Sequence, residues 1–304
     1  MYTSILVPLD GSAFGEAALA AATAIARRSG ARLHLAHVRG TATPMSGLPG
    51  LAAGWGPEAE NAARAYLDGV ADRTSDDLGE SISFALLDGP VPEGLRDYAR
   101  KQAISLIVMS THGRRGISRA WLGSVAAGVI RESPAPVLLV RPRKGGARPG
   151  PTLRIRRVLI PLDGSQLAEA IVAPAADLCK LANAAVTLVH VVEPAFRVGE
   201  AILVPAAQQE ANVYRERESE ASAYLARVAT PLRDAGLQVE TRVLGGEAVQ
   251  SVLDLAKEQS ADLFAIATHG RTGWQRLAFG SVADKIVRTS GLPVLVLRPH
   301  TEPR

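Results

Sequence analysis

The chain has 304 residues, a length that favours two domains of about 150 residues each over a single domain. Its 47% hydrophobic and 21% charged residues are ordinary for a globular protein, and a single cysteine, Cys179, excludes an internal disulfide framework and a cysteine-rich metal site. The formal charge is +4, the short basic clusters at 141–148 and 154–157 lie near an expected linker, and aromatic residues make up only 4%. We therefore expect no nucleic-acid partner.

No apolar run approaches the roughly 20 residues that are needed to span a bilayer. The first ten residues lack the basic n-region and the long apolar h-region of a signal peptide. These features predict a cytoplasmic protein without membrane contact.

The first half of the chain alternates apolar strands with helical segments. Its first strand breaks at a Pro-Leu-Asp-Gly-Ser turn, and an alanine-rich segment with apolar residues at helical spacing follows. A region rich in Gly, Pro and Ala, residues 40–57, separates the second strand from a charged helix. The expected strands are residues 4–9, 32–38, 81–87, 104–109 and 137–140, and the expected helices are residues 16–29, 58–78, 91–101 and 124–131.

The second half repeats this order. Its first two strands are displaced by 153 positions from their counterparts, and the displacement becomes 157 from the third strand onward. A net insertion of four residues between the second and third strands accounts for this change. The expected strands are residues 157–162, 185–192, 238–244, 263–266 and 294–297, and the expected helices are residues 167–182, 208–235, 248–259 and 281–288.

Strands that are apolar throughout and alternate with helices indicate parallel sheets that are covered on both faces. The pattern therefore predicts an α/β protein with two domains, each a five-stranded parallel sheet with helices on both faces. We expect the domains at residues 1–142 and 155–304, joined by a linker rich in Gly and Pro at 143–154. A doubly wound strand order would bring the ends of the first and fourth strands together and form a ligand crevice there.

The fourth strand of each half leads into a glycine-bearing loop and then into a helix. The loop begins Thr-His-Gly-Arg-x-Gly in both halves and ends in Gly-Ser-Val, so that the two copies cover residues 111–125 and 268–282. The free N–H groups of a helix N-terminus, the helix dipole and nearby glycines together form an anion site. This stretch is therefore the predicted phosphate-binding element of each half.

Taken together, these motifs resemble the universal stress protein family. The Pro-Leu-Asp-Gly-Ser turn, the His-Val pair late in the second strand, the loop and the final Pro-bounded apolar run occur in the same order in both halves. Because the match covers nearly the whole chain, the sequence resembles a tandem UspA-like protein of the ATP-binding type. This resemblance implies two Rossmann-like domains of the adenine nucleotide alpha hydrolase-like type that bind ATP, ADP or AMP, with or without Mg.

The ATP-binding members of this family carry the pattern Gly, two residues, Gly, nine residues, Gly, then Ser or Thr. The first glycine is replaced here by Ser110 and Ala267. A glycine would be required only if the backbone had a positive φ at this position, and we expect that a small side chain is sufficient. The pattern falls on Ser110, Gly113, Gly123 and Ser124 in the first half and on Ala267, Gly270, Gly280 and Ser281 in the second.

The resemblance implies a role for each part of the site. The loop and the helix start hold phosphates, the aspartate of the first turn accepts a hydrogen bond from adenine or ribose, and the valine of the second strand offers backbone groups to adenine. The residues alone leave other interpretations open, namely helix N-caps for the serines, Asx turns for the aspartates and strand core for the valines. The expected nucleotide-binding residues are Pro8, Leu9, Asp10, Val38, Met109, Ser110, Gly113, Arg114, Gly123, Ser124, Val125, Pro161, Leu162, Asp163, Val191, Ile266, Ala267, Gly270, Arg271, Gly280, Ser281 and Val282.

No catalytic residue and no metal-ligand set is expected. Histidine titrates near neutral pH, but no carboxylate or nucleophile lies at a readable spacing from His112 or His269. Neither loop has the lysine of the Gly-x4-Gly-Lys-[Ser/Thr] pattern, and no Gly-x-Gly-x-x-Gly follows the first strand. Any ATP hydrolysis should therefore be slow.

The last strand of each half bears on assembly. An apolar edge strand such as residues 137–140 is an aggregation hazard if it stays unpaired, so we expect the two halves to pair as an intramolecular pseudo-dimer, with a homodimer as a further step.

Three functional hypotheses remain. The first is a stress-response sensor or regulatory module with an adenine nucleotide in each half, the second is a structural or interaction protein without nucleotide, and the third is a slow ATPase.

Overall fold

The chain divides into two compact units, Met1–Leu153 and Arg154–Arg304. The computed structural model describes residues 1–39, 57–78, 81–111, 122–141, 154–193, 204–268 and 280–299. The expected linker at 143–154 lies almost entirely outside these residues, so its boundaries stay predictions.

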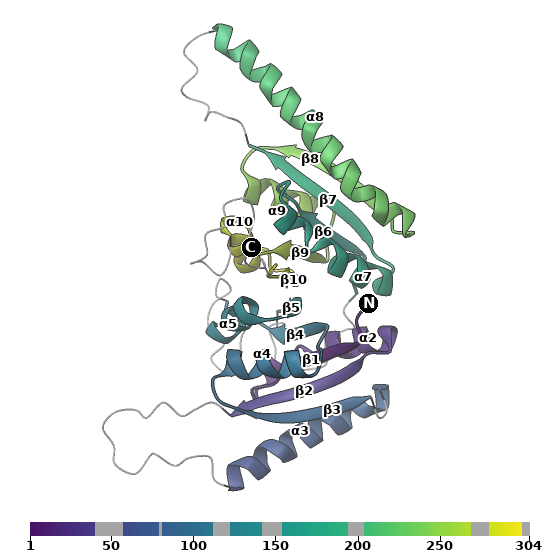
Figure 1. Cartoon of the computed structure of the whole chain (residues 1–304), viewed down its shortest axis with the longest axis vertical. Coiled ribbons are helices and arrows are strands. Elements are labelled where there is room, and N and C mark those ends of the chain that lie inside the picture. The colour runs from purple at the N-terminus through teal and green to yellow at the C-terminus, as the bar shows by residue number, and fades with distance from the viewer. Residues whose placement is uncertain are drawn as a thin grey trace, which may run out of the picture. The chain divides into compact units, whose positions relative to one another are not determined.

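The first unit is a parallel sheet with helices packed against it (Figure 1). Its strands are β1 (Ser4–Pro8), β2 (Arg32–Arg39), β3 (Ile82–Asp88), β4 (Leu106–Ser110) and β5 (Val137–Val140). Its helices are α1 (Ala13–Glu16), α2 (Leu19–Ser29), α3 (Pro57–Leu78), α4 (Val91–Lys101) and α5 (Ser124–Glu132). The strands lie in the order β3-β2-β1-β4-β5 and pair in parallel, with α2 packed on α3 and α4 packed on α5.

The second unit repeats this architecture. Its strands are β6 (Arg157–Pro161), β7 (Ala185–Val192), β8 (Val239–Gly245), β9 (Leu263–Ala267) and β10 (Val294–Leu297). Its helices are α6 (Gln166–Glu169), α7 (Val172–Ala182), α8 (Val204–Asp234), α9 (Ala248–Glu258) and α10 (Ser281–Thr289). The strand order β10-β9-β6-β7-β8 is again parallel throughout, which confirms the predicted tandem α/β fold.

The strand order reverses direction beside the first strand of each unit. β1 pairs with β2 on one side and with β4 on the other, where Leu6 lies opposite Ile107. In the second unit β6 pairs with β7 and β9, and Leu159 lies opposite Phe264. The expectation that the ends of the first and fourth strands lie side by side is therefore confirmed, and this edge is where open α/β sheets bind ligands.

The central strands form the core because helices cover both of their faces. Leu6 in β1 and Leu33 and Leu35 in β2 are fully buried, which explains why these strands are apolar without alternation. Two helices, α2 and α7, end at residues that tolerate a left-handed backbone. Gly30 ends α2 with φ of 67° and Asn183 ends α7 with φ of 51°.

The predicted first helix of each half is two helices in the structure, and in the first half it also begins three residues earlier than predicted. The structure has two helices there, because the hydroxyl of Ser12 caps α1 by accepting from the Gly15 N–H at 3.1 Å, so that the helix begins before the alanine-rich pattern. One turn later the N–H groups of Ala17 and Ala18 bond the carbonyls three residues back, and the chain re-enters a helix as α2. Ser165 starts α6 in the same way in the second unit.

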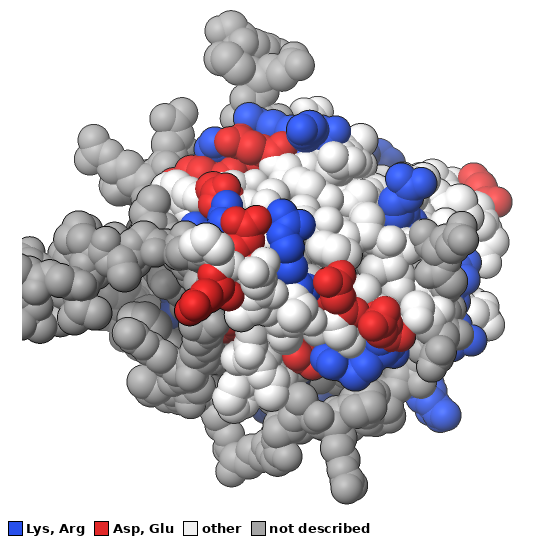
Figure 2. Space-filling view, turned by 90° about the horizontal axis from the view of Figure 1, so that it is seen from below, with Lys and Arg blue, Asp and Glu red and all other residues white. Residues whose placement is uncertain are grey.

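Figure 2 shows the face on the α3 side of the chain, where basic and acidic side chains are interspersed. Residues of α3 form ion pairs, with Arg64 3.0 Å from Glu60 and Arg73 3.3 Å from Glu16. No helix among the described residues is both long and apolar enough to cross a membrane.

Candidate functional site

The turn after the first strand is held by its own side chains. The Oδ1 atom of Asp10 accepts hydrogen bonds from the Ser12 N–H at 3.0 Å and from the Ser12 hydroxyl at 2.6 Å. Asp163 accepts from Ser165 at the same two distances. The Asx-turn interpretation of both aspartates is thus confirmed, and it fixes the direction of each carboxylate at the edge where the ligand crevice is expected.

The second strand is tied to the end of the first. The imidazole Nδ1–H of His37 donates to the carbonyl of Leu9 at 2.8 Å, which assigns the proton to Nδ1 because a carbonyl can only accept. The N–H of Leu9 in turn donates to the carbonyl of Ala36 at 2.8 Å. These bonds place Val38, the next residue of β2, beside the Asp10 turn.

The glycine before each of the helices α5 and α10 is bonded back to the first residue after the preceding strand. The N–H of Gly123 donates to the carbonyl of Thr111 at 3.1 Å, and the N–H of Gly280 donates to the carbonyl of Thr268 at 2.5 Å. A Cβ atom added to Gly123 or Gly280 would lie only 3.2 or 3.3 Å from the same carbonyl oxygen. Glycine is therefore favoured here by the close approach of the two backbones.

The position of the missing family glycine does not need a positive φ. Ser110 and Ala267 are the last residues of β4 and β9, in extended backbone. Among the described residues other than glycine, only Ala103, Asn183 and Ser260 have a positive φ. The replacement of this glycine by a small residue thus carries no backbone strain.

The helix starts lack a side-chain cap. Gly123 and Gly280 are the N-cap residues of α5 and α10, so Ser124 and Ser281 occupy the first helical position and the N-cap interpretation of these serines is wrong. Since glycine has no side chain to accept from the first turn, the N–H groups at each helix start remain suited to an anionic ligand.

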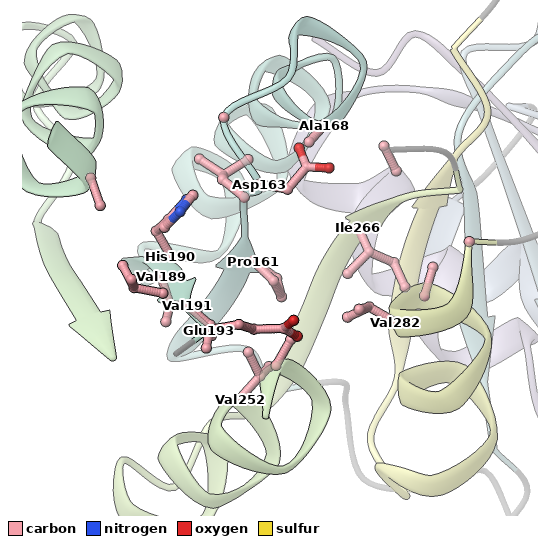
Figure 3. Close-up of a pocket in the computed structure, with 18 of the residues that line it drawn as sticks. Pro161, Asp163, Ala168, Val189, His190, Val191, Glu193, Val252, Ile266 and Val282 are labelled. Carbon is pink, nitrogen blue, oxygen red and sulfur yellow. The ribbon is translucent and has the colours of Figure 1, made fainter. Parts of the chain in front are cut away.

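A cavity of ≈ 850 Å³ lies at this edge of the second unit (Figure 3). Its volume is within the range of small-molecule and cofactor sites, and its walls come from β6, β7, β9, α8, α9 and α10. The sequence-predicted residues that line it are Pro161, Leu162, Asp163, Val191, Ile266, Ala267, Gly280, Ser281 and Val282.

The first-unit counterparts lie at equivalent positions of their own sheet. The ends of β1, β2 and β4 and the start of α5 carry Pro8, Leu9, Asp10, Val38, Met109, Ser110, Gly123, Ser124 and Val125. Leu9 and Met109 are 3% and 5% exposed, so their side chains contribute mainly to the core. The loop residues Gly113, Arg114, Gly270 and Arg271 lie outside the described residues, as do His112 and His269.

A tyrosine, a glutamate and an arginine meet behind the aspartate turn of the second unit. Burial raises the pKa of the Tyr224 hydroxyl, and the nearby carboxylates of Glu169 and Asp163 raise it further. Arg227 lies 5.2 Å from the centre of the Tyr224 ring and 3.0 Å from Glu169. Tyr224 therefore stays neutral at this wall of the cavity, which it also lines.

The first unit builds the same cluster with its arginine on a different helical turn. Burial raises the pKa of Tyr66, as do Glu16 and Asp10, and Arg73 pairs with Glu16 at 3.3 Å. Arg73 passes over Gly69, where an added Cβ would be 3.7 Å from its Nη1 atom. An arginine–glutamate ion pair is thus present in both units, Arg73–Glu16 in the first and Arg227–Glu169 in the second.

Several cavity residues were not predicted from the sequence. Arg217, Glu220 and Tyr224 come from the long helix α8, and nothing in its helical periodicity relates them to the strand ends. Glu193 had a usable signal, because it follows β7 directly and lies two residues after Val191.

The described residues contain no group of three or more His, Cys, Asp or Glu side chains that could hold a metal ion.

Comparison with known protein families accounts for this duplicated arrangement. The model of the universal stress protein family matches residues 1–141 and 154–298. The chain belongs to the universal stress protein family. As a tandem universal stress protein it carries two family domains, one in each unit.

Relatives of the same length exist among universal stress proteins. A universal stress protein of Mycolicibacterium smegmatis is 27% identical over 302 residues, which cover 97% of each chain. The crystal structure of a universal stress protein from Archaeoglobus fulgidus has a TM-score of 0.64 at 18% identity and covers 97% of this chain and 98% of its own. A putative universal stress protein from Pseudomonas aeruginosa has a TM-score of 0.66 at 20% identity, with 98% and 94% covered. Both structures support the fold.

Proposed function

We propose that each unit of this universal stress protein binds an adenine nucleotide at the carboxyl edge of its sheet. The observation that carries the proposal is the cavity of the second unit, because every described residue that was predicted for that half lines it. These residues come from four separate segments of the chain, so their convergence does not follow from sequence proximity.

The chemistry of the walls supports a nucleotide. The start of α10 offers N–H groups at Ser281 and Val282 to phosphate, and each charge-assisted hydrogen bond contributes roughly 1.5–3 kcal/mol. Asp163 is oriented as an acceptor by its Asx turn, and Val191 brings strand backbone to the opposite wall. The ligand is proposed to be ATP, ADP or AMP, with any Mg held through its phosphates.

The biological role proposed is that of a cytoplasmic sensor or regulatory module of the stress response. The two units act as an intramolecular pseudo-dimer, and two chains can associate further as a homodimer. The chemistry at the described part of the site favours binding over turnover, since the carboxylates of Asp10 and Asp163 accept the hydrogen bonds of their own turns, so ATP hydrolysis is proposed to be at most slow.

The test is to denature the purified protein, to identify released nucleotides by mass spectrometry and then to titrate the emptied, refolded protein with ATP. The proposal predicts a co-purified adenine nucleotide or saturable binding of added ATP. Absence of both at millimolar ATP would favour the structural or interaction protein. Turnover above the enzyme-free background that is lost on substitution of the loop glycines would favour the slow ATPase.

A further inference from the structure

The strand β3 lies at one end of the strand order of the first unit, and no described strand pairs with its outer edge (Figure 1). On the inner edge, the N–H of Leu33 in β2 donates to the carbonyl of Ser81 at 2.8 Å. Because backbone groups alternate in direction along a strand, the odd-numbered residues of β3 bond to β2, whereas Ile82, Phe84 and Leu86 point their N–H and C=O groups outward. These three residues therefore present a row of hydrogen-bonding groups at the outer edge.

The side chains along this edge carry no charge and are mostly apolar. Residues 82–87 read Ile-Ser-Phe-Ala-Leu-Leu, and Phe84 is 39% exposed although α3 packs on the strand. Asp88 is the only charged residue of β3, and its carboxylate lies 2.6 Å from the guanidinium of Arg39 at the strand end. An uncharged, apolar edge is the kind that pairs with a strand of another chain.

The corresponding strand of the second unit is protected against such pairing. β8 carries Glu240 and Arg242, whose side chains lie 3.1 Å apart, at positions where β3 has small uncharged residues. Arg233 of α8 also donates from Nε and Nη2 to the carbonyl of Val239, at 3.3 and 3.0 Å. That carbonyl belongs to the outer edge of β8, because the preceding one, of Gln238, accepts from β7. Charged side chains on an edge strand oppose the approach of a second strand.

We propose that β3 is a homodimer interface, at which it pairs antiparallel with β3 of a second copy of the chain around a two-fold axis at Phe84. The inference rests on the proposed homodimer and names the surface through which two chains associate. A second copy fits because the edge is self-complementary: Phe84 lies opposite Phe84 of the partner subunit, and Ile82 lies opposite Leu86 of the partner subunit. Each pair of opposed outward-facing residues exchanges two N–H···O bonds.

The contact is favourable in charge but small. The five positions from 82 to 86 are uncharged, so the antiparallel register places no like charges opposite each other there, and the central pair is aromatic. An interface limited mainly to one strand per chain belongs to the small class. We therefore expect a reversible dimer with a dissociation constant on the order of 10 µM.

The test is analytical ultracentrifugation of the full chain from about 1 to 200 µM, which should show a monomer–dimer equilibrium. Phe84→Lys should weaken the dimer by at least roughly 30-fold, because two ammonium groups would face each other across the axis. The matched control is Thr241→Lys, at the equivalent position of β8, which should change the dissociation constant by less than about twofold. Thermal unfolding of each variant establishes that it is folded.

A cross-link tests the register without weakening the fold by a charge. A hydrogen-bonded antiparallel pair has its Cα atoms about 5.5 Å apart, which is within the range of a disulfide. Phe84→Cys should therefore form a covalent dimer under mild oxidation, whereas Thr241→Cys should not. The native Cys179 is fully buried and does not interfere in the folded protein.

Three results would overturn the inference, and they are distinguishable. A dimer that persists unchanged in folded Phe84→Lys and is not cross-linked in Phe84→Cys would exclude β3 and leave the proposed homodimer standing. Equal loss of the dimer in Phe84→Lys and Thr241→Lys would show a general effect of charge. A parent protein that stays monomeric at about 200 µM would refute the homodimer together with its interface, while nucleotide binding is measured independently by calorimetry.

Discussion

The substitution Gly280→Asp at the start of α10 should abolish nucleotide binding in the second unit while changing the stability of the fold little. The backbone of Gly280, with φ of −65° and ψ of 157°, lies in a region that any residue can adopt, and aspartate is among the preferred N-cap residues. Its Cβ would lie 3.3 Å from the carbonyl oxygen of Thr268, which is tight. These opposing effects predict a change in the free energy of unfolding within about 1 kcal/mol.

The same substitution should abolish nucleotide binding in the second unit. A carboxylate about 6 Å from a phosphate charge, at an effective dielectric constant of about 20, costs about 3 kcal/mol, or roughly 100-fold in affinity. The new side chain also occupies N–H groups of the first helical turn, each of which would otherwise contribute roughly 1.5–3 kcal/mol to phosphate binding. The two costs add to at least about 4 kcal/mol, or roughly 1000-fold in affinity, so a site with micromolar parent affinity would bind ATP only at millimolar concentration or above.

Calorimetric titration with ATP measures this outcome directly. The stoichiometry should fall from two nucleotides per chain to one in Gly280→Asp, while Gly280→Ala, which adds the Cβ atom without the charge, should lose less than about tenfold in the affinity of that site. Unchanged stoichiometry in a Gly280→Asp protein whose thermal unfolding matches the parent would refute the placement of phosphate at this helix.

Three further predictions concern other parts of the chain. Gly69→Ala should stabilise α3 by about 0.5–1 kcal/mol in thermal unfolding and keep the Arg73–Glu16 pair, because the added Cβ is at ordinary contact distance; destabilisation would contradict this. Burial raises the pKa of the Cys179 thiol to about 12, so a thiol reagent should react only after denaturation. Burial and the charge of Arg32 lower the pKa of His34, so unfolding by urea should become easier as pH falls from about 7 to about 5, and His34→Gln should flatten that slope.

The repeat in the sequence carried most of the fold prediction. Apolar strands at a common displacement in both halves gave the strand number, the parallel pairing and the position of the crevice, because these depend on burial pattern and on topological rules. The break between α1 and α2 was missed because alanine-rich periodicity is the same on both sides of it, and a single cap at Ser12 sets the earlier start.

The strand-end residues of the candidate site were also predictable, since parallel strands end at one edge. The contribution of α8 was not, because the side chains that reach the cavity depend on how this helix packs over β7 and β8. The arginine of the Tyr66 cluster was not predictable from the sequence for the same reason, because its contacts depend on packing. Arg73 and Arg227 occupy different turns of their helices, so only the structure shows that they make equivalent ion pairs with Glu16 and Glu169.

The most direct test of the central claim is a crystal structure of the full chain grown with saturating ATP. The account predicts ATP in the cavity of the second unit, with phosphate oxygens within hydrogen-bond distance of the N–H groups of Ser281 and Val282 and the base beside Val191. Continuous density for ATP elsewhere on the chain, with this cavity filled only by water, would contradict it.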